Sequence, residues 1–404
     1  MTNSSAAASA ARNIAAARAE VELVFLCART RMDQSRARAI ESLASSGLDW
    51  DFVTDYAARH GLTPLVTRHL HELCPHLVPV AASSRLRQLQ QRTAALNTYL
   101  AHELLVVVRE FERQGISAIA WKGPSLAVSA YGRLSLRQFC DLDILLRKED
   151  VPRAAEILRG RGYALTPALD EVQLTMMLRT QCNLAFARDE RRVIVELHWD
   201  VAAKNFSAPF DREELWQRAG ETPLNGGSVK TLAPEDLLLS LCVHGAKHQW
   251  ERAAWVCDVA ELLRAESGLD WGRLTLKARR SGSERLLWLG LSLAGKLLDA
   301  PLPPEIVREI ACDPSLGRLC TIVSRRLLHE DGLRGGVSGL TGQIMFQLGA
   351  RRRLRDKVRY LGFVLSPTDE DLRRVKLSRR FTPLYYLLRP LRMLATGGPR
   401  HFHH

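Results

Sequence analysis

The chain changes its hydrophobic periodicity near its middle, and this change limits the folds that it can adopt. In the first part of the chain, apolar residues recur at spacings of three and four, which predicts a series of helices. Residues 116–121 instead form a short apolar run bounded by glycines, as in a buried strand. Residues 139–146 and 193–199 are two further strand candidates. We therefore expect a small unit that mixes strands and helices over residues 112–230.

Helical spacing occupies most of the remaining chain. Residues 86–114 form one long helical pattern that ends at Gly115, a typical stop signal. The segment 225–227, Asn-Gly-Gly, is a clear turn, after which the pattern is helical again. The expected fold class is α/β (α+β), with a small mixed sheet flanked by helical regions. Its expected parts are an N-terminal helical region (1–111), the mixed unit (112–230), a C-terminal helical region (231–345) and a basic tail (346–404).

The net charge of +13 is concentrated near the C-terminus. Residues 351–404 contain 14 Lys and Arg but only 4 Asp and Glu, so they hold +10 of that charge, and the rest of the chain is close to neutral. A groove for nucleic acid would need basic residues on the body of the protein, so this distribution disfavours a nucleic-acid partner. Three interpretations of the tail stay open. It packs on the body with its charges in water, contacts an anionic membrane surface as a peripheral segment, or binds nucleic acid.

The cysteines and the apolar runs favour a cytoplasmic protein. The eight cysteines are scattered and include no Cys-x-x-Cys pair, which argues against a disulfide framework and against a thiolate zinc site. No run of 18 apolar residues occurs, so the sequence predicts no membrane-spanning helix. The Ala-rich start lacks the apolar core of a secretory signal, although an organellar transit peptide is an alternative interpretation.

Two acids on the second strand candidate form the motif with the clearest chemistry. Residues i and i+2 of a strand point to the same face, so Asp141 and Asp143 project side by side while Leu142 and Ile144 point into a core. Two carboxylates at this separation repel each other, and a divalent cation such as Mg²⁺ offsets the repulsion. The alternative is a pair of exposed acids on an edge strand.

A third acid lies on the next strand candidate. Glu196 is flanked by Val195 and Leu197, and a lone carboxylate is costly to bury there unless it has a partner. Alternation places His198 on the same face as Glu196, where it would orient that carboxylate, contact a substrate, or serve as a hydrogen-bonded structural histidine.

A glycine-containing turn follows the first strand candidate. Lys122-Gly123-Pro124-Ser125 precedes a helical pattern, and such a turn lets backbone N–H groups approach a phosphate. Ser125 would cap the helix or bind phosphate, and Lys122 would neutralise the phosphate charge. Neither a Walker loop nor a Gly-x-Gly-x-x-Gly motif is present. Arg137, four residues before Asp141, either contacts a triphosphate or is an ordinary surface arginine.

The segment 235–264 contains a second polar constellation. On a single helix its polar members would share one face within roughly 80°, and they are His244, His248, Glu251, Trp255 and Asp258. Three interpretations stay open. The stripe is a solvated face, completes a pocket for nucleotide or acceptor, or binds zinc through two histidines four residues apart.

These motifs together resemble a known family. The first of them is the run AWKGPSLAVSAYGRLSLRQFCDLDILL, followed by VIVELHWDV. Both are similar to the uncharacterised bacterial nucleotidyltransferases of the DNA polymerase β superfamily. The segments SGLDWDFVTDYAARHGLTPLV, HGAKHQWERAAWVCDVAELL and YYLLRPLR also look like features of that family. The resemblance therefore covers nearly the whole chain.

The resemblance implies a catalytic core at residues 112–230, with three acids around two divalent ions, Mg²⁺ or Mn²⁺. Asp141 and Asp143 match the first two acids, and Glu196 matches the third, which helps in many relatives to activate the attacking hydroxyl. The implied reaction moves a nucleoside monophosphate from an NTP, such as ATP, to a hydroxyl of a small molecule, glycan, peptide or protein. The remaining expected site residues divide into nucleotide contacts (Lys122, Gly123, Ser125 and Arg137) and acceptor or pocket contacts (His198, His244, His248 and Asp258).

The chain departs from the family pattern at the turn. The superfamily usually has Gly-Ser or Gly-Gly after the first strand, whereas this chain has Gly123-Pro124-Ser125 and a longer spacing to Asp141. Proline removes one backbone donor. This motivates an alternative function, a nucleotidyltransferase fold with weakened catalysis that acts as a nucleotide- or partner-binding module.

Overall fold

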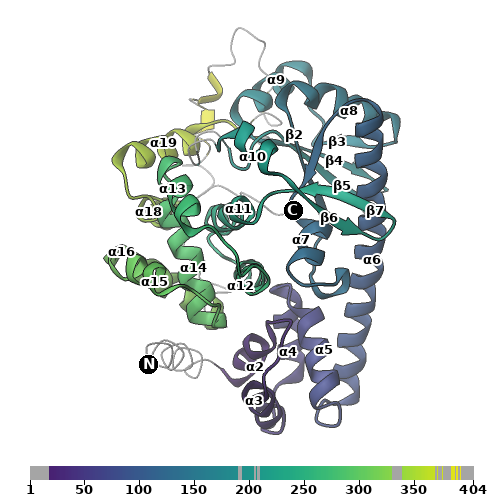
Figure 1. Ribbon diagram of the computed structural model, residues 1–404, viewed down its shortest axis with the longest axis vertical. Coiled ribbons are helices and arrows are strands. Elements are labelled where there is room, and N and C mark those ends of the chain that lie inside the picture. Colours follow the sequence, from purple (N-terminus) through teal and green to yellow (C-terminus); the bar gives the residue numbers. More distant parts are fainter. Residues whose placement is uncertain are drawn as a thin grey trace.

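A computed structural model describes residues 18–189, 193–203, 206, 210–329 and 339–368, together with 371, 375, 384–386, 388, 389 and 392. A mixed sheet lies at one end of the molecule beside the long helix α6 (Val80–Arg113) (Figure 1). The N-terminal helices lie below the sheet in this view. The C-terminal helices lie on the left, across the molecule from α6. The fold is therefore mixed α/β, as the sequence predicts.

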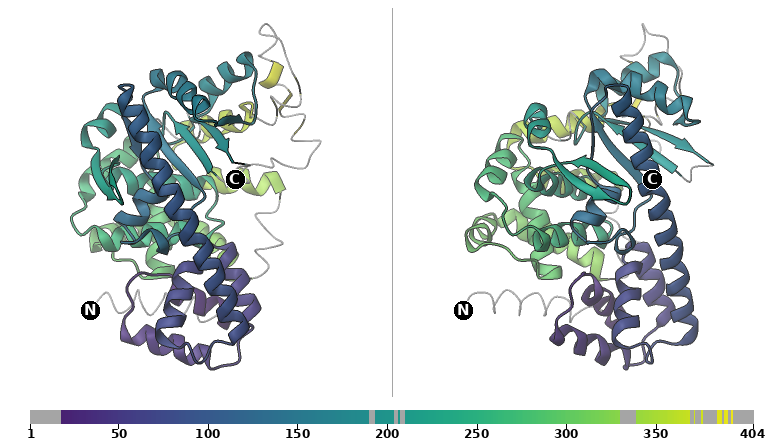
Figure 2. Two further views of the ribbon diagram at one scale, coloured as in Figure 1. Left: turned by 90° about the vertical axis from the view of Figure 1, so that its right-hand side faces the viewer. Right: turned by 45° about the vertical axis from the view of Figure 1, so that its right-hand side comes forward.

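The N-terminal helical region leads into α6. Its first helices are α2 (Ala19–Cys27), α3 (Gln34–Ala44), α4 (Trp50–Arg59) and α5 (Thr63–Leu73). The side chains of Asp33 and Asp49 cap α3 and α4 by accepting hydrogen bonds from backbone N–H groups of the first turn. Helix α6 is 34 residues long and extends from these helices along the sheet (Figure 2). It ends just before Gly115, whose φ of 71° favours glycine, so the predicted stop is confirmed.

The main sheet has five strands in the order β1-β2-β5-β4-β3. The strands are β1 (Ala118–Ala120), β2 (Asp141–Leu146), β3 (Ala164–Thr166), β4 (Asn183–Arg188) and β5 (Val193–His198). Strands β2 and β5 pair in parallel, and the other neighbours pair antiparallel. Between them in the sequence lie α7 (Gly123–Ser129), α8 (Val151–Gly160) and α9 (Glu171–Thr180), with short 3₁₀ turns η1 (Leu134–Leu136) and η2 (Lys148–Asp150).

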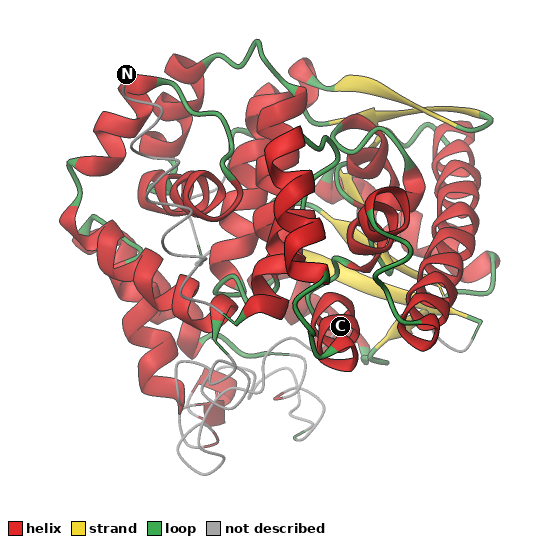
Figure 3. Ribbon diagram, turned by 90° about the horizontal axis from the view of Figure 1, so that it is seen from below, coloured by secondary structure: helices red, strands yellow, loops and turns green. Residues whose placement is uncertain are grey.

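The sequence analysis missed four strands. It predicted β1, β2 and β5 but not β3 and β4, which form the antiparallel edge of the sheet beside β5. It also predicted only the turn between β6 (Gly220–Leu224) and β7 (Gly227–Thr231), which form a hairpin apart from the main sheet (Figure 3). Strands β6 and β7 carry few apolar residues, so their alternation is weak.

Strand alternation divides the sheet residues between two hydrophobic clusters. Leu142, Ile144 and Val195 belong to the cluster that also contains residues of α6 and α8. Ile119 and Leu145, which have the opposite parity, belong to the cluster formed mainly by the N-terminal and C-terminal helices. The sheet therefore has one face against α6 and α8, and its other face toward the remaining helices.

The C-terminal helices begin after the hairpin. They are α11 (Pro234–Lys247), α12 (Ala253–Ala265), α13 (Trp271–Arg280), α14 (Glu284–Leu298), α15 (Pro304–Ala311), α16 (Pro314–Leu328), α18 (Gly339–Gly349) and α19 (Leu354–Leu365), and α10 (Arg212–Arg218) precedes the hairpin. The prediction of one helix across 235–264 is wrong, because Gln249 and Trp250 adopt φ values of 54° and 57° and break it. The break buries Trp250 against Gly245 and Gly290, where no side chain interferes. In the part of the chain that the structure describes, every helix is too short or too polar to span a bilayer.

Candidate active site

The two central parallel strands place the predicted acids on one face of the sheet. Asp141 and Asp143 lie on the same face of β2 as Leu145, which is the face turned away from α6. Glu196 and His198 on β5 pair with Asp143 and Leu145, so they lie on that face too. The pairing register sets Asp143 directly opposite Glu196. Parallel pairing thus brings together residues more than fifty positions apart in the sequence.

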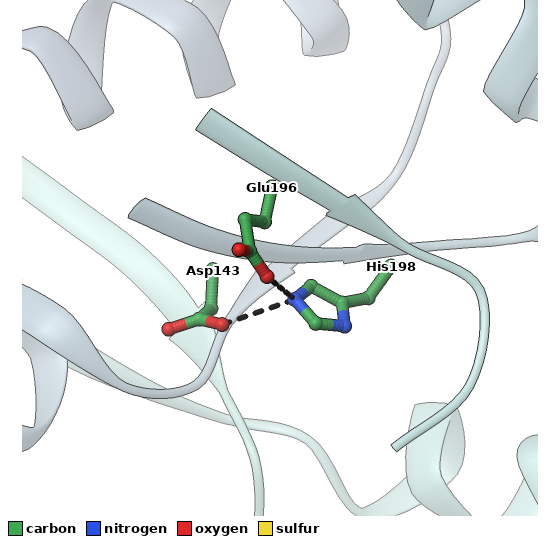
Figure 4. A group of neighbouring side chains, drawn as sticks. All are labelled: Asp143, Glu196 and His198. Atoms are coloured by element: carbon green, nitrogen blue, oxygen red, sulfur yellow. Dashed lines mark ion pairs between the residues drawn. The ribbon is translucent and has the colours of Figure 1, made fainter. Parts of the chain in front are cut away.

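Asp143, Glu196 and His198 form a buried cluster with the donor set of a metal site (Figure 4). Nε2 of His198 lies 3.0 Å from Oδ1 of Asp143 and 3.0 Å from Oε2 of Glu196. One ligand atom from each residue lies within 4.8 Å of the others. Among the described residues this is the group of acids and histidines that could hold a divalent ion.

Neighbouring polar groups fix the cluster. Nζ of Lys122 lies 2.9 Å from Oδ1 of Asp143, and the amide of Asn183 donates a 2.8 Å hydrogen bond to Oε2 of Glu196. Despite these contacts, Oδ1 of Asp143 and both ring nitrogens of His198 are buried without hydrogen-bond geometry to any partner. Carboxylate oxygens and an imidazole nitrogen that converge in this way fit a divalent cation.

The charges in the cluster are strongly coupled. Burial raises the pKa of Asp141 to about 7, and the charges of Asp143 and Glu196 add to this rise. Burial opposes ionisation of Asp143 too, but Lys122 and His198 hold its pKa well below the ordinary value. Burial alone would lower the pKa of His198, yet its contacts with Asp143, Cys182 and Glu196 raise that pKa well above the usual range. The carboxylates therefore concentrate negative charge that only nearby cations offset.

The glycine turn packs directly on strand β2. Gly123 adopts a φ of 50°, and a Cβ atom at this position would lie 3.1 Å from the backbone oxygen of Asp141. Ser125 is fully buried, and its hydroxyl donates to the carbonyl oxygens of Ala120 (3.0 Å) and Lys122 (2.8 Å). The side chain of Ser125 therefore supports the turn. Pro124 lies in the first turn of α7, where its missing N–H breaks no helical hydrogen bond.

Arg137 lies in an ion pair with its side chain only 11% exposed, so it is not an ordinary surface arginine, and its contact with a triphosphate stays a prediction. Its Nε and Nη2 donate to the two carboxylate oxygens of Asp258 at 2.7 Å and 2.9 Å. The hydroxyl of Tyr131 donates to the same carboxylate at 2.7 Å. The structure thus joins two residues that the sequence analysis assigned to different parts of the site, because α12 lies against the segment between α7 and β2.

The acids open into a cavity of about 460 Å³. Its opposite wall comes from α11, α12 and the break between them, with His244, His248 and Trp255 half-buried and Glu251 exposed, so the role of this segment in a pocket stays a prediction. The ring centroids of His244 and His248 lie 4.7 Å apart, and those of His248 and Trp255 lie 5.2 Å apart. Burial, together with the charge of Lys122, lowers the pKa of His244 well below its usual value. The two histidines do not belong to a metal-binding group among the described residues, so the zinc interpretation gains no support.

The C-terminal part of the chain also reaches the cavity. Phe363, Ser366, Thr368 and Arg389 contribute to its lining. Arg389 is buried, and its Nη1 lies 2.7 Å from Oδ2 of Asp371. At these positions the basic tail packs on the body, and the rest of residues 369–404 mostly lies outside the described residues.

The sequence analysis missed several residues of the cavity. Asn183 was missed because strand β4 was missed, although the apolar residues at 184 and 186 alternate with their neighbours and could have indicated a strand. Arg59 and Arg252 come from the end of α4 and the start of α12. Nothing in the sequence separates these two arginines from other surface arginines.

Comparison with known proteins assigns the chain to a family. A family model described as an uncharacterised nucleotidyltransferase matches residues 46–299, more than half of the chain. The chain belongs to this nucleotidyltransferase family. The family match extends from just before α4 to the end of α14, so it includes both acid-bearing strands and the helices across the cavity.

The other comparisons are less informative about this member of the family. No curated protein matches it. Among solved structures, one similar chain is that of an antigenic nucleotidyltransferase-like protein from Paracoccidioides brasiliensis, with 15% sequence identity and a TM-score of 0.28. The match covers 53% of this chain and 96% of that chain. A similarity at this level says nothing about the substrate or the mechanism of this chain.

Proposed function

We propose that this chain transfers a nucleoside monophosphate from an NTP to a hydroxyl acceptor. The observation that supports the proposal most is the convergence of Asp141, Asp143 and Glu196 on one wall of a cavity, in a member of a nucleotidyltransferase family. The DNA polymerase β superfamily, a bacterial source and a cytoplasmic location belong to the same proposal.

The donor set suits Mg²⁺ or Mn²⁺, with Asp143, Glu196 and the deprotonated ring of His198 as ligands and Asp141 beside them. A divalent cation bound there would stabilise negative charge on the reacting phosphate oxygens. Lys122, whose ammonium already lies against Asp143, would neutralise the phosphates. Gly123 would allow the chain to approach them closely, and Ser125 and Arg137 would hold the turn and the cavity wall in place.

The reaction assigns a role to Glu196. The acceptor oxygen forms a bond to the α-phosphorus, the bond from that phosphorus to the bridging oxygen breaks, and pyrophosphate leaves. The hydroxyl proton passes to the carboxylate of Glu196, which Asn183 orients through its hydrogen bond. His244, His248 and the Arg137–Asp258 pair would shape the pocket that holds the base or the acceptor.

A nucleotide screen tests this function. The protein is incubated with each of four NTPs labelled at the α-phosphate, with Mg²⁺ or Mn²⁺, and with small-molecule, glycan, peptide and protein acceptors. We expect metal-dependent transfer of label that Asp143→Asn abolishes. Asp51→Asn is the matched control, because that side chain is 91% exposed on α4. If no nucleotide binds and Asp143→Asn changes nothing, the proposal is refuted.

A second candidate function is a binding module without turnover. Pro124, which removes a backbone donor from the turn, favours it. Calorimetry would then detect NTP binding that Asp143→Asn weakens, while the transfer assay stays at background.

Contact between the basic tail and a membrane also stays a prediction, and sedimentation with anionic lipid vesicles tests it.

A further inference from the structure

Three helices meet at a junction beside the cavity. His60, which follows α4, receives a 3.2 Å hydrogen bond at Nδ1 from the backbone N–H of Ala253, and its carbonyl oxygen receives one from Ala254 at 3.0 Å. The hydroxyl of Tyr56 on α4 donates to the carbonyl oxygen of Leu327 on α16. These bonds hold the end of α4 against both the start of α12 and the last turn of α16.

Each element contributes an arginine next to one of these bonded residues. Arg59 precedes His60, Arg252 precedes Ala253, and Arg326 precedes Leu327. Burial lowers the pKa of His60 to about 4, and the charges of all three arginines add to this effect. The three guanidinium groups are therefore within electrostatic range of one buried ring.

These arginines have no anionic partner of their own, unlike others near the cavity. Arg137 and Arg389 form close ion pairs with Asp258 and Asp371, but no ion pair with Arg59, Arg252 or Arg326 occurs in the described ranges. Nε and Nη2 of Arg326 are buried without any hydrogen-bond partner. Burial lowers the pKa of Arg326, and Glu251 is the acid that acts against this effect.

Arg59 and Arg252 are exposed and have no acid partner among the described residues, so they are free to bind an anion. Arg59 and Arg252 both line the cavity that contains the acid cluster. The planar fork of arginine matches the oxygens of a phosphate group. We propose that Arg59 and Arg252 form a subsite for a phosphate group of a ligand that occupies the cavity.

Two sources of the bound phosphate group fit this subsite. One is the β,γ-phosphates of the nucleotide, and the other is a phosphate on the acceptor. This assignment of the source rests on the proposed function, whereas binding of the anion itself does not. The opposing possibility is that Arg59 and Arg252, which are exposed, are only solvated surface residues.

Calorimetry with pyrophosphate as the probe tests the subsite in the full chain without divalent metal. We expect Arg252→Gln to weaken pyrophosphate binding by about fivefold, and Arg59→Gln with Arg252→Gln to weaken it by about twentyfold, since phosphate contacts of arginine are charge-assisted. Arg326 is not among the residues that line the cavity, so Arg326→Gln should weaken pyrophosphate binding less. Arg113→Gln is the matched control, because that arginine is 72% exposed at the end of α6. Thermal melting establishes that each variant is folded.

The outcomes separate the alternatives. Unchanged binding in the double variant, with loss only in Lys122→Met, would overturn the subsite by placing the anion at the acid cluster. If the double variant weakens ATP but not adenosine, the phosphate belongs to the nucleotide. If it weakens pyrophosphate but not ATP, the phosphate belongs to the acceptor. Pyrophosphate binding is measured without metal and without transfer, so a failure of the transfer reaction would not be confused with a failure of the subsite.

Discussion

Asp143 on β2 lies directly opposite Glu196 on β5, and Nε2 of His198 lies 3.0 Å from a carboxylate oxygen of each. The histidine thus occupies the third position around the two acids. This relationship depends on the parallel pairing of β2 and β5, which sets two side chains from distant parts of the sequence at the same height on the sheet.

His198 should contribute directly to metal affinity. We expect His198→Ala to weaken Mn²⁺ binding by about 10- to 100-fold, because the variant removes a nitrogen donor and the group that orients both carboxylates. Electron paramagnetic resonance of free Mn²⁺ measures the Kd. His102→Ala, an exposed histidine on α6, is the control. Equal Kd values for His198→Ala and the unaltered protein would show that His198 is not a metal ligand.

The Arg137–Asp258 pair should stabilise the fold and not bind phosphate directly. Arg137→Met leaves a buried carboxylate without its cation and should lower the free energy of unfolding by about 3–5 kcal/mol. The double variant Arg137→Met with Asp258→Asn should recover part of this loss, and denaturant unfolding measures both. If Arg137→Met unfolds like the unaltered protein and instead only raises the KM for NTP, Arg137 is a phosphate ligand.

Stability should fall in mild acid through His60. Its folded pKa of about 4 lies below the unfolded value of about 6.5, so the unfolded chain takes up the proton first as the pH falls. The contribution is complete above pH 6.5 and is lost as the pH falls toward 4, by about 2 kcal/mol between pH 7 and pH 5. His60→Asn keeps an acceptor for Ala253 but does not titrate. If the free energy of unfolding depends on pH in the same way in His60→Asn and in the unaltered protein, this assignment is wrong.

The break between α11 and α12 should tolerate no larger residue at Gly245. A Cβ atom there would lie 2.5 Å from the ring of Trp250. Gly245→Ala should therefore lower the free energy of unfolding by about 1–3 kcal/mol, as overpacking does. Gly317→Ala on α16 is the matched control, because nothing lies within 4 Å of a Cβ atom at that position. If Gly245→Ala leaves the free energy of unfolding unchanged, Trp250 can move to make room for the methyl group.

Local patterns in the sequence predicted the parts of the site that lie on single strands. Alternation in Asp141–Leu146 and Val193–His198 was enough to place Asp143 and Glu196 on buried strands with their core neighbours on the other face. The strand pairing could not be predicted, because the register depends on contacts between distant segments. The pairing of Arg137 with Asp258 could not be predicted for the same reason.

The polar stripe of residues 244–258 shows a different limit. Helical spacing correctly grouped His244, His248 and Trp255, but the segment is not one helix. The tertiary burial of Trp250 overrides the local preference for helix, and the residues still meet because α11 and α12 both face the cavity. Helical periodicity therefore identified residues that do lie together, but it predicted the wrong backbone conformation between them.

A crystal structure with Mn²⁺ and a non-hydrolysable NTP tests the central claim most directly, since anomalous scattering locates the metal. We expect Mn²⁺ in direct contact with carboxylate oxygens of Asp143 and Glu196, with the α-phosphate beside it and Lys122 on the phosphates. Asp143→Asn should remove the metal peak, and Asp51→Asn should keep it. A nucleotide bound elsewhere in the protein, with no metal between β2 and β5, would contradict the account.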